Sequence, residues 1–154
     1  MSKKIVILGL GNILLKDEGV GVHVVNEILK KKVPVNVEVI DGGTSGLDVL
    51  LSSGNIDRLF VIDALKSGSR PAAVHRLEPG DIAAPGGDRI SMHQVGLPDA
   101  LESAKKLGIR IGKVVIFGVE PGDVGPGTEM TPELKEKAPD IAEMVLKEAG
   151  NDCE

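Results

Sequence analysis

Short apolar runs recur along the chain and alternate with longer stretches in which apolar side chains return every three or four positions. A short uninterrupted apolar run is typical of a strand buried on both faces, and the wider spacing is typical of an amphipathic helix. The strands that we expect are residues 3–8, 35–40, 58–64 and 113–119. The helices that we expect are residues 19–31, 47–52, 98–107 and a last one starting at Pro132.

Residues 72–77 (AAVHRL) predict a strand of another kind. They follow the strand at 58–64 after a gap too short for a crossover helix, so an antiparallel edge strand fits better. The elements together predict the α/β class, with a three-layer α/β/α sandwich around a twisted, mostly parallel five-stranded sheet. We expect one domain over residues 1–150, followed by a polar tail over residues 151–154.

Several residues are expected to shape the ends of these elements. Side-chain caps are expected from Asp17 for the first helix, from Thr44 or Ser45 for the second and from Thr131 for the last. Pro139 should kink or restart the last helix. Residues 80–92, rich in proline and glycine, are expected to form a loop that delivers His93.

Composition excludes several classes of function. The 154 residues include only two Phe and no Tyr or Trp, and the net charge is −5. The core must therefore be aliphatic, and nucleic acid and anionic membranes are poor partners for this chain. The only cysteine, Cys153, lies in the polar tail, which excludes a disulfide framework and a CxxC zinc site. The apolar runs are too short for a membrane helix or a signal peptide, so we expect a cytoplasmic protein.

Three potential metal ligands, Glu18, Asp63 and His93, each follow or end an expected strand. In an open α/β sheet, such positions converge on the crevice beyond the carboxyl ends of the strands. Two carboxylates and an imidazole suit a divalent transition metal. Asp63 carries most weight because it interrupts an apolar strand, where an unpaired carboxylate is costly. Acids at a helix start are also favoured by the helix dipole, and a loop histidine is often a surface residue.

Two other site types are disfavoured by single residues. Gly9 and Gly11 suggest a dinucleotide fingerprint, but Leu14 occupies the position of its third glycine, so a tight turn is the better interpretation. A serine hydrolase triad of Ser45, His93 and Asp63 would need glycine where Leu47 stands. His23 and His75, which lie away from the strand ends, are interpreted as structural.

Taken together, these segments resemble one family, the hydrogenase maturation endopeptidases of the HybD/HycI type. The matching segments are residues 9–14 (GLGNIL), 17–21 (DEGVG), 41–44 (DGGT), 61–64 (VIDA), 91–97 (SMHQVGL), 118–121 (GVEP) and 131–134 (TPEL). The resemblance spans nearly the whole chain in the correct order, and residues 79–88 are its least family-like part. It implies a five-stranded sheet between helices.

The resemblance also implies a function. A protein of this family removes the C-terminal extension from the precursor of a [NiFe]-hydrogenase large subunit after nickel insertion, as an aspartic-type or metal-dependent endopeptidase. The family's nickel ligands fall on Glu18, Asp63 and His93. Its DGGT segment, implicated in substrate recognition and cleavage, places Asp41 as the candidate catalytic residue. Three weak ligands leave coordination positions open, so we expect the nickel to be supplied by the precursor. A non-catalytic nickel carrier for hydrogenase assembly remains the alternative.

Overall fold

The computed structural model describes residues 3–81, 91–92 and 97–151. Its strands are β1 (Ile5–Leu10), β2 (Val37–Gly43), β3 (Ile56–Lys66), β4 (Val74–Leu77), β5 (Ser91–Met92) and β6 (Ile111–Val119). Its α-helices are α1 (Val20–Ile28), α2 (Gly46–Ser53), α3 (Leu97–Lys106) and α4 (Pro132–Asn151). Two 3-10 turns, η1 (Lys16–Gly19) and η2 (Pro79–Asp81), complete the described elements.

The strands form one sheet in the order β2-β1-β3-β6-β4. β1 is parallel to both β2 and β3, and β3 is parallel to β6, whereas β4 is antiparallel to β6 at one edge. The predicted five-stranded, mostly parallel sheet with one antiparallel edge strand is therefore confirmed. The short strand β5, which pairs antiparallel with the end of β3, falls within the segment expected to be a loop.

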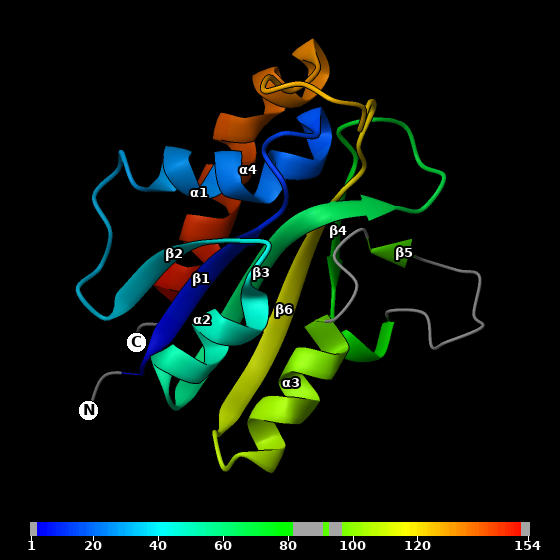
Figure 1. Cartoon of the computed structure of the whole chain (residues 1–154). Coiled ribbons are helices and arrows are strands. Elements are labelled where there is room, and N and C mark those ends of the chain that lie inside the picture. Colours follow the sequence, from blue (N-terminus) through cyan, green and yellow to red (C-terminus); the bar gives the residue numbers. More distant parts are fainter. Residues whose placement is uncertain (1–2, 82–90, 93–96, 152–154) are drawn as a thin grey trace.

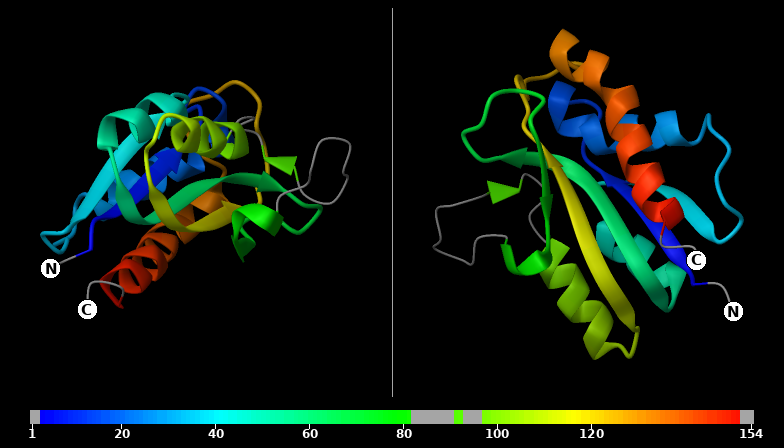
Figure 2. Two further views of the ribbon diagram at one scale, coloured as in Figure 1. Left: turned by 90° about the horizontal axis from the view of Figure 1, so that it is seen from below. Right: turned by 180° about the vertical axis from the view of Figure 1, so that it is seen from behind.

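The helices cover both faces of the sheet, α1 and α4 on one side and α2 and α3 on the other (Figures 1 and 2). Side chains alternate between these layers along β3. Phe60 and Ile62 pack in the core beneath α1 and α4, while Val61 and Leu65 pack in the core beneath α2 and α3. All residues of β1 are buried, as expected of a central strand covered on both faces. The three-layer sandwich is confirmed.

Two glycines let α1 lie against the backbone of the sheet. A methyl group on Gly21 would overlap the carbonyl oxygens of Leu10 and Ile62, and one on Gly9 would overlap the carbonyl oxygen of Gly21. The start of α1 therefore lies directly over the ends of β1 and β3. This close approach explains a glycine pattern that only superficially resembles a dinucleotide fingerprint.

Some expectations about helix ends are wrong. Ser45 immediately precedes α2, yet its side chain makes no capping hydrogen bond. α4 starts at Pro132 as predicted and includes Pro139, so the helix does not restart there, and a kink at Pro139 stays a prediction. Within the described ranges, no helix has the length and hydrophobicity that crossing a membrane requires.

Candidate functional site

The candidate site lies where β1, β2 and β3 end side by side. Gly9 in β1 pairs with Asp41 on one side and with Ile62 on the other. Because neighbouring strands are about 4.8 Å apart, the backbones of Asp41 and Ile62 are separated by roughly 10 Å. The loop after β1 returns through η1, which carries Glu18, to the start of α1. The structure thus brings the segments bearing Glu18, Asp41 and Asp63 to one edge of the sheet.

Asp63 is fully buried near the end of β3. Its Oδ1 accepts a hydrogen bond from the backbone N–H of Ala64 at 2.8 Å. Its Oδ2 is also buried and has no hydrogen-bond partner among the described residues. The pKa of the Asp63 carboxyl is raised to about 8, mainly by burial and further by the negative charge of Glu18, against the opposing effect of the Ala64 hydrogen bond. A cation beside Oδ2 would remove this penalty on the ionised form.

Glu18 is half-buried in η1 and close enough to Asp63 for its charge to act on that carboxyl. Two carboxylates that repel one another at the end of a sheet do not stabilise the fold. They suit a site that receives a positive charge from outside. Two of the three predicted ligands are therefore together.

His93, the third predicted ligand, lies outside the described residues. The strand that leads to it in the sequence is described. Met92 in β5 pairs with Leu65, two positions after Asp63 along β3. Over residues 3–81, 91–92 and 97–151, no three His, Cys, Asp or Glu side chains are grouped so that they could hold a metal ion.

Asp17, next to Glu18, has a different role from the predicted helix cap. Its carboxylate is fully buried and accepts hydrogen bonds from the loop that precedes α4. The donors are the backbone N–H groups of Gly122 at 2.7 Å, Asp123 at 3.0 Å and Thr131 at 2.7 Å, and the Thr131 hydroxyl at 2.8 Å. The residue before α1 is Gly19, which makes no side-chain cap. Asp17 thus fixes η1, and with it Glu18, to the loop before α4.

Asp41, the predicted catalytic residue, is exposed at the end of β2. Its Oδ1 accepts a hydrogen bond from the N–H of Gly43 at 3.0 Å, which closes a local turn. Side chains two positions apart in a strand lie on the same face of the sheet. Val37 and Val39, which precede Asp41 at this spacing, pack in the core beneath α1 and α4. Asp41 therefore lies on the face of the sheet that α1 covers. Asp63 lies on the opposite face, because Val61 and Leu65, two positions away in β3, pack beneath α2 and α3.

His23 in α1 is the titratable neighbour of Asp41. Burial lowers the pKa of His23, and the negative charges of Asp17 and Asp41 act in the opposite direction. Its Nε2 is buried and has no hydrogen-bond partner within the described part of the chain. The interpretation of His23 as purely structural thus overlooked its place beside the DGGT segment.

A buried glutamate that the sequence interpretation passed over organises the connection from β3 to β4. Glu120 is 5% exposed, and its Oε1 accepts hydrogen bonds from the N–H and hydroxyl of Ser67 at 2.9 and 2.7 Å. It also accepts one from the N–H of Ser69 at 3.2 Å. His75 Nε2 lies 3.1 Å from both serine hydroxyls. Like Asp63, Glu120 ends an apolar strand, so the same sequence signal could have found it.

These four side chains do not form a hydrolase triad. In a triad, the acid holds the histidine, which in turn activates the serine. Here the Glu120 carboxylate and His75 Nε2 are both within hydrogen-bond distance of the Ser67 hydroxyl. The hydroxyl thus stands between the two groups, and the carboxylate does not orient the imidazole. The network instead anchors the turn that follows β3, and the backbone of Glu120 binds the residues before β4 through Ala72 and Ala73.

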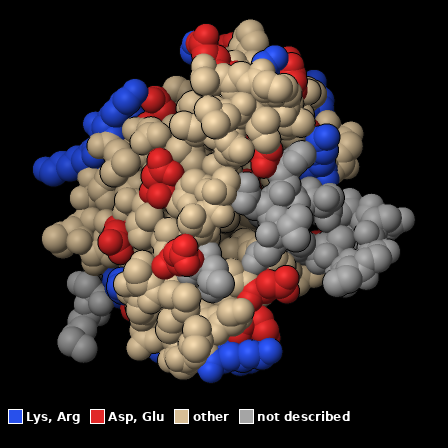
Figure 3. Space-filling model, in the orientation of Figure 1, with Lys and Arg blue, Asp and Glu red and all other residues tan. Residues whose placement is uncertain are grey.

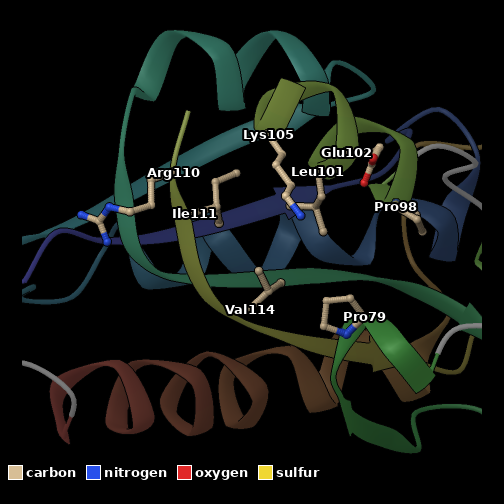
Figure 4. A pocket seen from close by; sticks show the side chains of 8 residues that line it. All are labelled: Pro79, Pro98, Leu101, Glu102, Lys105, Arg110, Ile111 and Val114. Atoms are coloured by element: carbon tan, nitrogen blue, oxygen red, sulfur yellow. The ribbon is translucent and has the colours of Figure 1, made fainter. Parts of the chain in front are cut away.

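A separate cavity of about 480 Å³ lies between α3 and β6 (Figure 4), and neither Glu18 nor Asp63 lines it. Its lining includes the apolar Leu101, Ile111 and Val114 and the charged Glu102, Lys105 and Arg110. On the face drawn in Figure 3, acidic side chains are scattered over the surface, and basic ones lie mostly at its margins. The candidate site at the strand ends, which includes Glu18 and Asp63, is therefore distinct from this cavity.

Fold and site together define an α/β protein with two mutually repelling carboxylates at the carboxyl ends of its central strands. The sequence profile of the hydrogenase maturation protease family, HycI, matches residues 22–148. The hydrogenase 2 maturation protease of Escherichia coli strain K12 is 34% identical over 145 residues, which cover 93% of this chain and 88% of that protein. The chain belongs to the hydrogenase maturation protease family, and the predicted resemblance is confirmed.

Solved structures agree with this assignment. The hydrogenase maturating endopeptidase HybD from E. coli has a TM-score of 0.83 and 33% identity, covering 96% of this chain and 93% of that one. An endopeptidase from E. coli solved in solution has a TM-score of 0.79 and 31% identity, covering 94% and 90%. The expected activity, peptide-bond hydrolysis in hydrogenase maturation, is that of this family.

Proposed function

We propose that this chain is a cytoplasmic endopeptidase that removes the C-terminal extension from the precursor of a [NiFe]-hydrogenase large subunit after nickel insertion, and that it recognises the bound nickel. The pairing of Glu18 with the buried Asp63 carries the proposal. Asp63 Oδ2 has no partner in the described structure, and its ionised form is disfavoured by burial and by Glu18. Such a pair is completed by a cation that arrives with the substrate.

The donor set fits nickel. Carboxylate oxygens and an imidazole nitrogen suit a divalent transition metal, and His93 follows directly after β5, which is paired with the end of β3. Glu18, Asp63 and His93 would hold the ion while the precursor retains its own ligands. The ion would supply positive charge that polarises the scissile carbonyl or a bound water. Docking of a nickel-free precursor would leave Asp63 Oδ2 without a partner among the described residues.

Asp41 would orient the peptide at the end of β2. It is exposed, and the turn that it closes with Gly43 keeps its carboxylate at the edge of the site. The charge of Asp41 acts on His23, so this imidazole is our candidate to accept a proton near the substrate. Ser45 lacks the glycine context of an activated serine, so direct attack by water is the route that the residues support.

The test compares nickel-loaded with nickel-free precursor of a large subunit from the same organism, with the intact mass as the readout. We expect the purified protein to shorten only the loaded precursor. Asp63→Asn and His93→Ala should abolish processing, and Ser45→Ala should retain most of it. Equal cleavage of both precursors would refute nickel recognition. An unchanged mass with the loaded precursor would refute the peptidase assignment and favour the carrier.

A further inference from the structure

β2 is the outermost strand on its side of the sheet, and no described element runs along its free edge (Figures 1 and 2). In a parallel pair, each residue directs its N–H and C=O to the same side. The N–H of Ile5 bonds to Asn36, so Glu38 and Ile40 are the residues of β2 that face β1. The main-chain groups of Val39 and Asp41 therefore point outwards.

This free edge is suited to an extended peptide. Val39 and Asp41 each present an N–H and a C=O, separated by the two-residue repeat of a strand, and the C=O of Val37 adds a further acceptor in the same row. Unpaired main-chain groups at a sheet edge recruit an added strand, and alternate side chains of that strand are then read by pockets. The opposite edge, β4, is only four residues long.

The free edge leads directly to the candidate site. β2 ends at Asp41, Gly42 and Gly43, beside the end of β1. Among the described residues, a Cβ on Gly43 would meet only the Asp41 side chain within 4 Å, so no other described atom crowds this end of the strand. A strand added to β2 would lie about 15 Å from the backbone of Ile62, across three strand spacings. About four or five extended residues span that distance.

We propose that the free edge of β2 binds the C-terminal extension of the precursor as an added antiparallel strand. This inference rests on the proposed function. The folded, nickel-bearing part of the precursor would occupy the crevice, and the extension begins after the scissile bond. The extension would therefore leave the crevice at the Gly43 end of β2 and run back along Asp41, Val39 and Val37. Its strand-forming residues begin about four or five positions after the scissile bond.

Amide hydrogen exchange tests the added strand directly. In the free protein, we expect the amides of Glu38 and Ile40 to be protected by β1 and those of Val39 and Asp41 to exchange rapidly. A synthetic peptide with the sequence of the extension, added at millimolar concentration, should slow exchange at Val39 and Asp41 by about tenfold or more. Unchanged exchange at both amides in the presence of saturating peptide would overturn the proposal.

Val39→Pro provides an independent test because proline removes the outward N–H and is tolerated at a sheet edge. Val39→Ala is the matched control, since it trims the same side chain and retains the N–H. For nickel-loaded precursor, Val39→Pro should lower kcat/KM about tenfold relative to Val39→Ala, mainly through KM. Equal kcat/KM in the two variants would remove the edge strand from recognition while leaving the proposed function intact. Failure of the wild-type protein to cleave would instead refute the proposed function.

Discussion

The negative charge of Glu18 acts on the buried carboxyl of Asp63 and, together with burial, raises the pKa of Asp63 to about 8. The two residues are 45 positions apart in the sequence, and Glu18 comes from η1 whereas Asp63 lies near the end of β3. A fold gains no stability from placing them together, because burial and the charge of Glu18 both disfavour the ionised form of Asp63. The cation that we propose for this site would relieve that cost.

The raised pKa of Asp63 predicts an unusual pH dependence of stability. In the unfolded chain this carboxyl loses its proton near pH 3.8, whereas in the folded protein it retains the proton up to about pH 8. The folded state therefore binds more protons between these values, so stability should fall as pH rises from about 4 to 8. The loss attributable to Asp63 should be on the order of 5 kcal/mol.

Denaturant unfolding of metal-free protein at several pH values, compared with Asp63→Asn, isolates this contribution. The amide cannot ionise, so the stability of Asp63→Asn should not fall between about pH 4 and 8 through this group. At pH 8 the variant should be more stable than the wild type. His23 titrates in both proteins and cancels in the comparison. Asp48→Asn, a change at an exposed residue of α2, should retain the wild-type slope. Parallel stability curves for wild type and Asp63→Asn would contradict the buried, protonated state of Asp63.

Nickel binding should depend on pH for the same reason. An ion can bind Asp63 only after its proton leaves, so the affinity of the metal-free protein for Ni²⁺ should rise about tenfold between pH 6.5 and 7.5. Calorimetric titration at the two pH values measures this change together with the proton released. Asp63→Asn should abolish this change of affinity with pH, and Asp48→Asn should preserve it. A pH-independent affinity would show that Asp63 is not a ligand.

The fold could be predicted largely from local pattern. The apolar run of β1 and the periodicity of α1 specify a strand and a helix without reference to the rest of the chain. The short gap before β4 was enough to predict its antiparallel direction. β5 was missed because two residues carry no periodicity, and their strand conformation comes from pairing with Leu65 and Lys66. Ser45 failed as a cap for a related reason, since capping depends on local geometry that residue type does not determine.

The candidate site was predictable where a polar residue interrupts an apolar strand. Asp63 was recognised by that signal, and Glu120 shows the same signal without having been selected. The role of Asp17 could not be inferred, because its partners, Gly122, Asp123 and Thr131, lie more than 100 positions away. The sequence did not predict that Asp41 and Asp63 lie on opposite faces of the sheet. That relationship depends on how β2, β1 and β3 are aligned, which only the observed register shows.

Asp17 should be a major contributor to stability and to the position of Glu18. In Asp17→Asn, the amide nitrogen cannot accept the hydrogen bonds that one carboxylate oxygen now receives, and buried N–H groups lose their acceptor. We expect a loss of roughly 3 kcal/mol in the free energy of unfolding. The exposed pair of Lys135 with Glu129 gives a comparison, and Glu129→Ala should have a much smaller effect because solvent screens an exposed ion pair. Similar losses in the two variants would disprove the anchoring role.

Gly21→Ala tests whether the close approach of α1 to the sheet shapes the site. The added methyl group would meet the backbone oxygens of Leu10 and Ile62, which cannot move aside as a flexible side chain could. We expect a loss of about 2–3 kcal/mol in the free energy of unfolding as α1 is displaced from the strand ends. Gly80→Ala is the control, because no described atom lies within 4 Å of the position that its methyl group would occupy, and its effect should stay within about 0.5 kcal/mol. Because α1 follows η1 directly, the displacement should also separate Glu18 from Asp63 and lower the pKa of Asp63, which the pH dependence of stability would report. A destabilised Gly21→Ala protein with the wild-type pH profile would show that α1 packing and the carboxylate pair are independent.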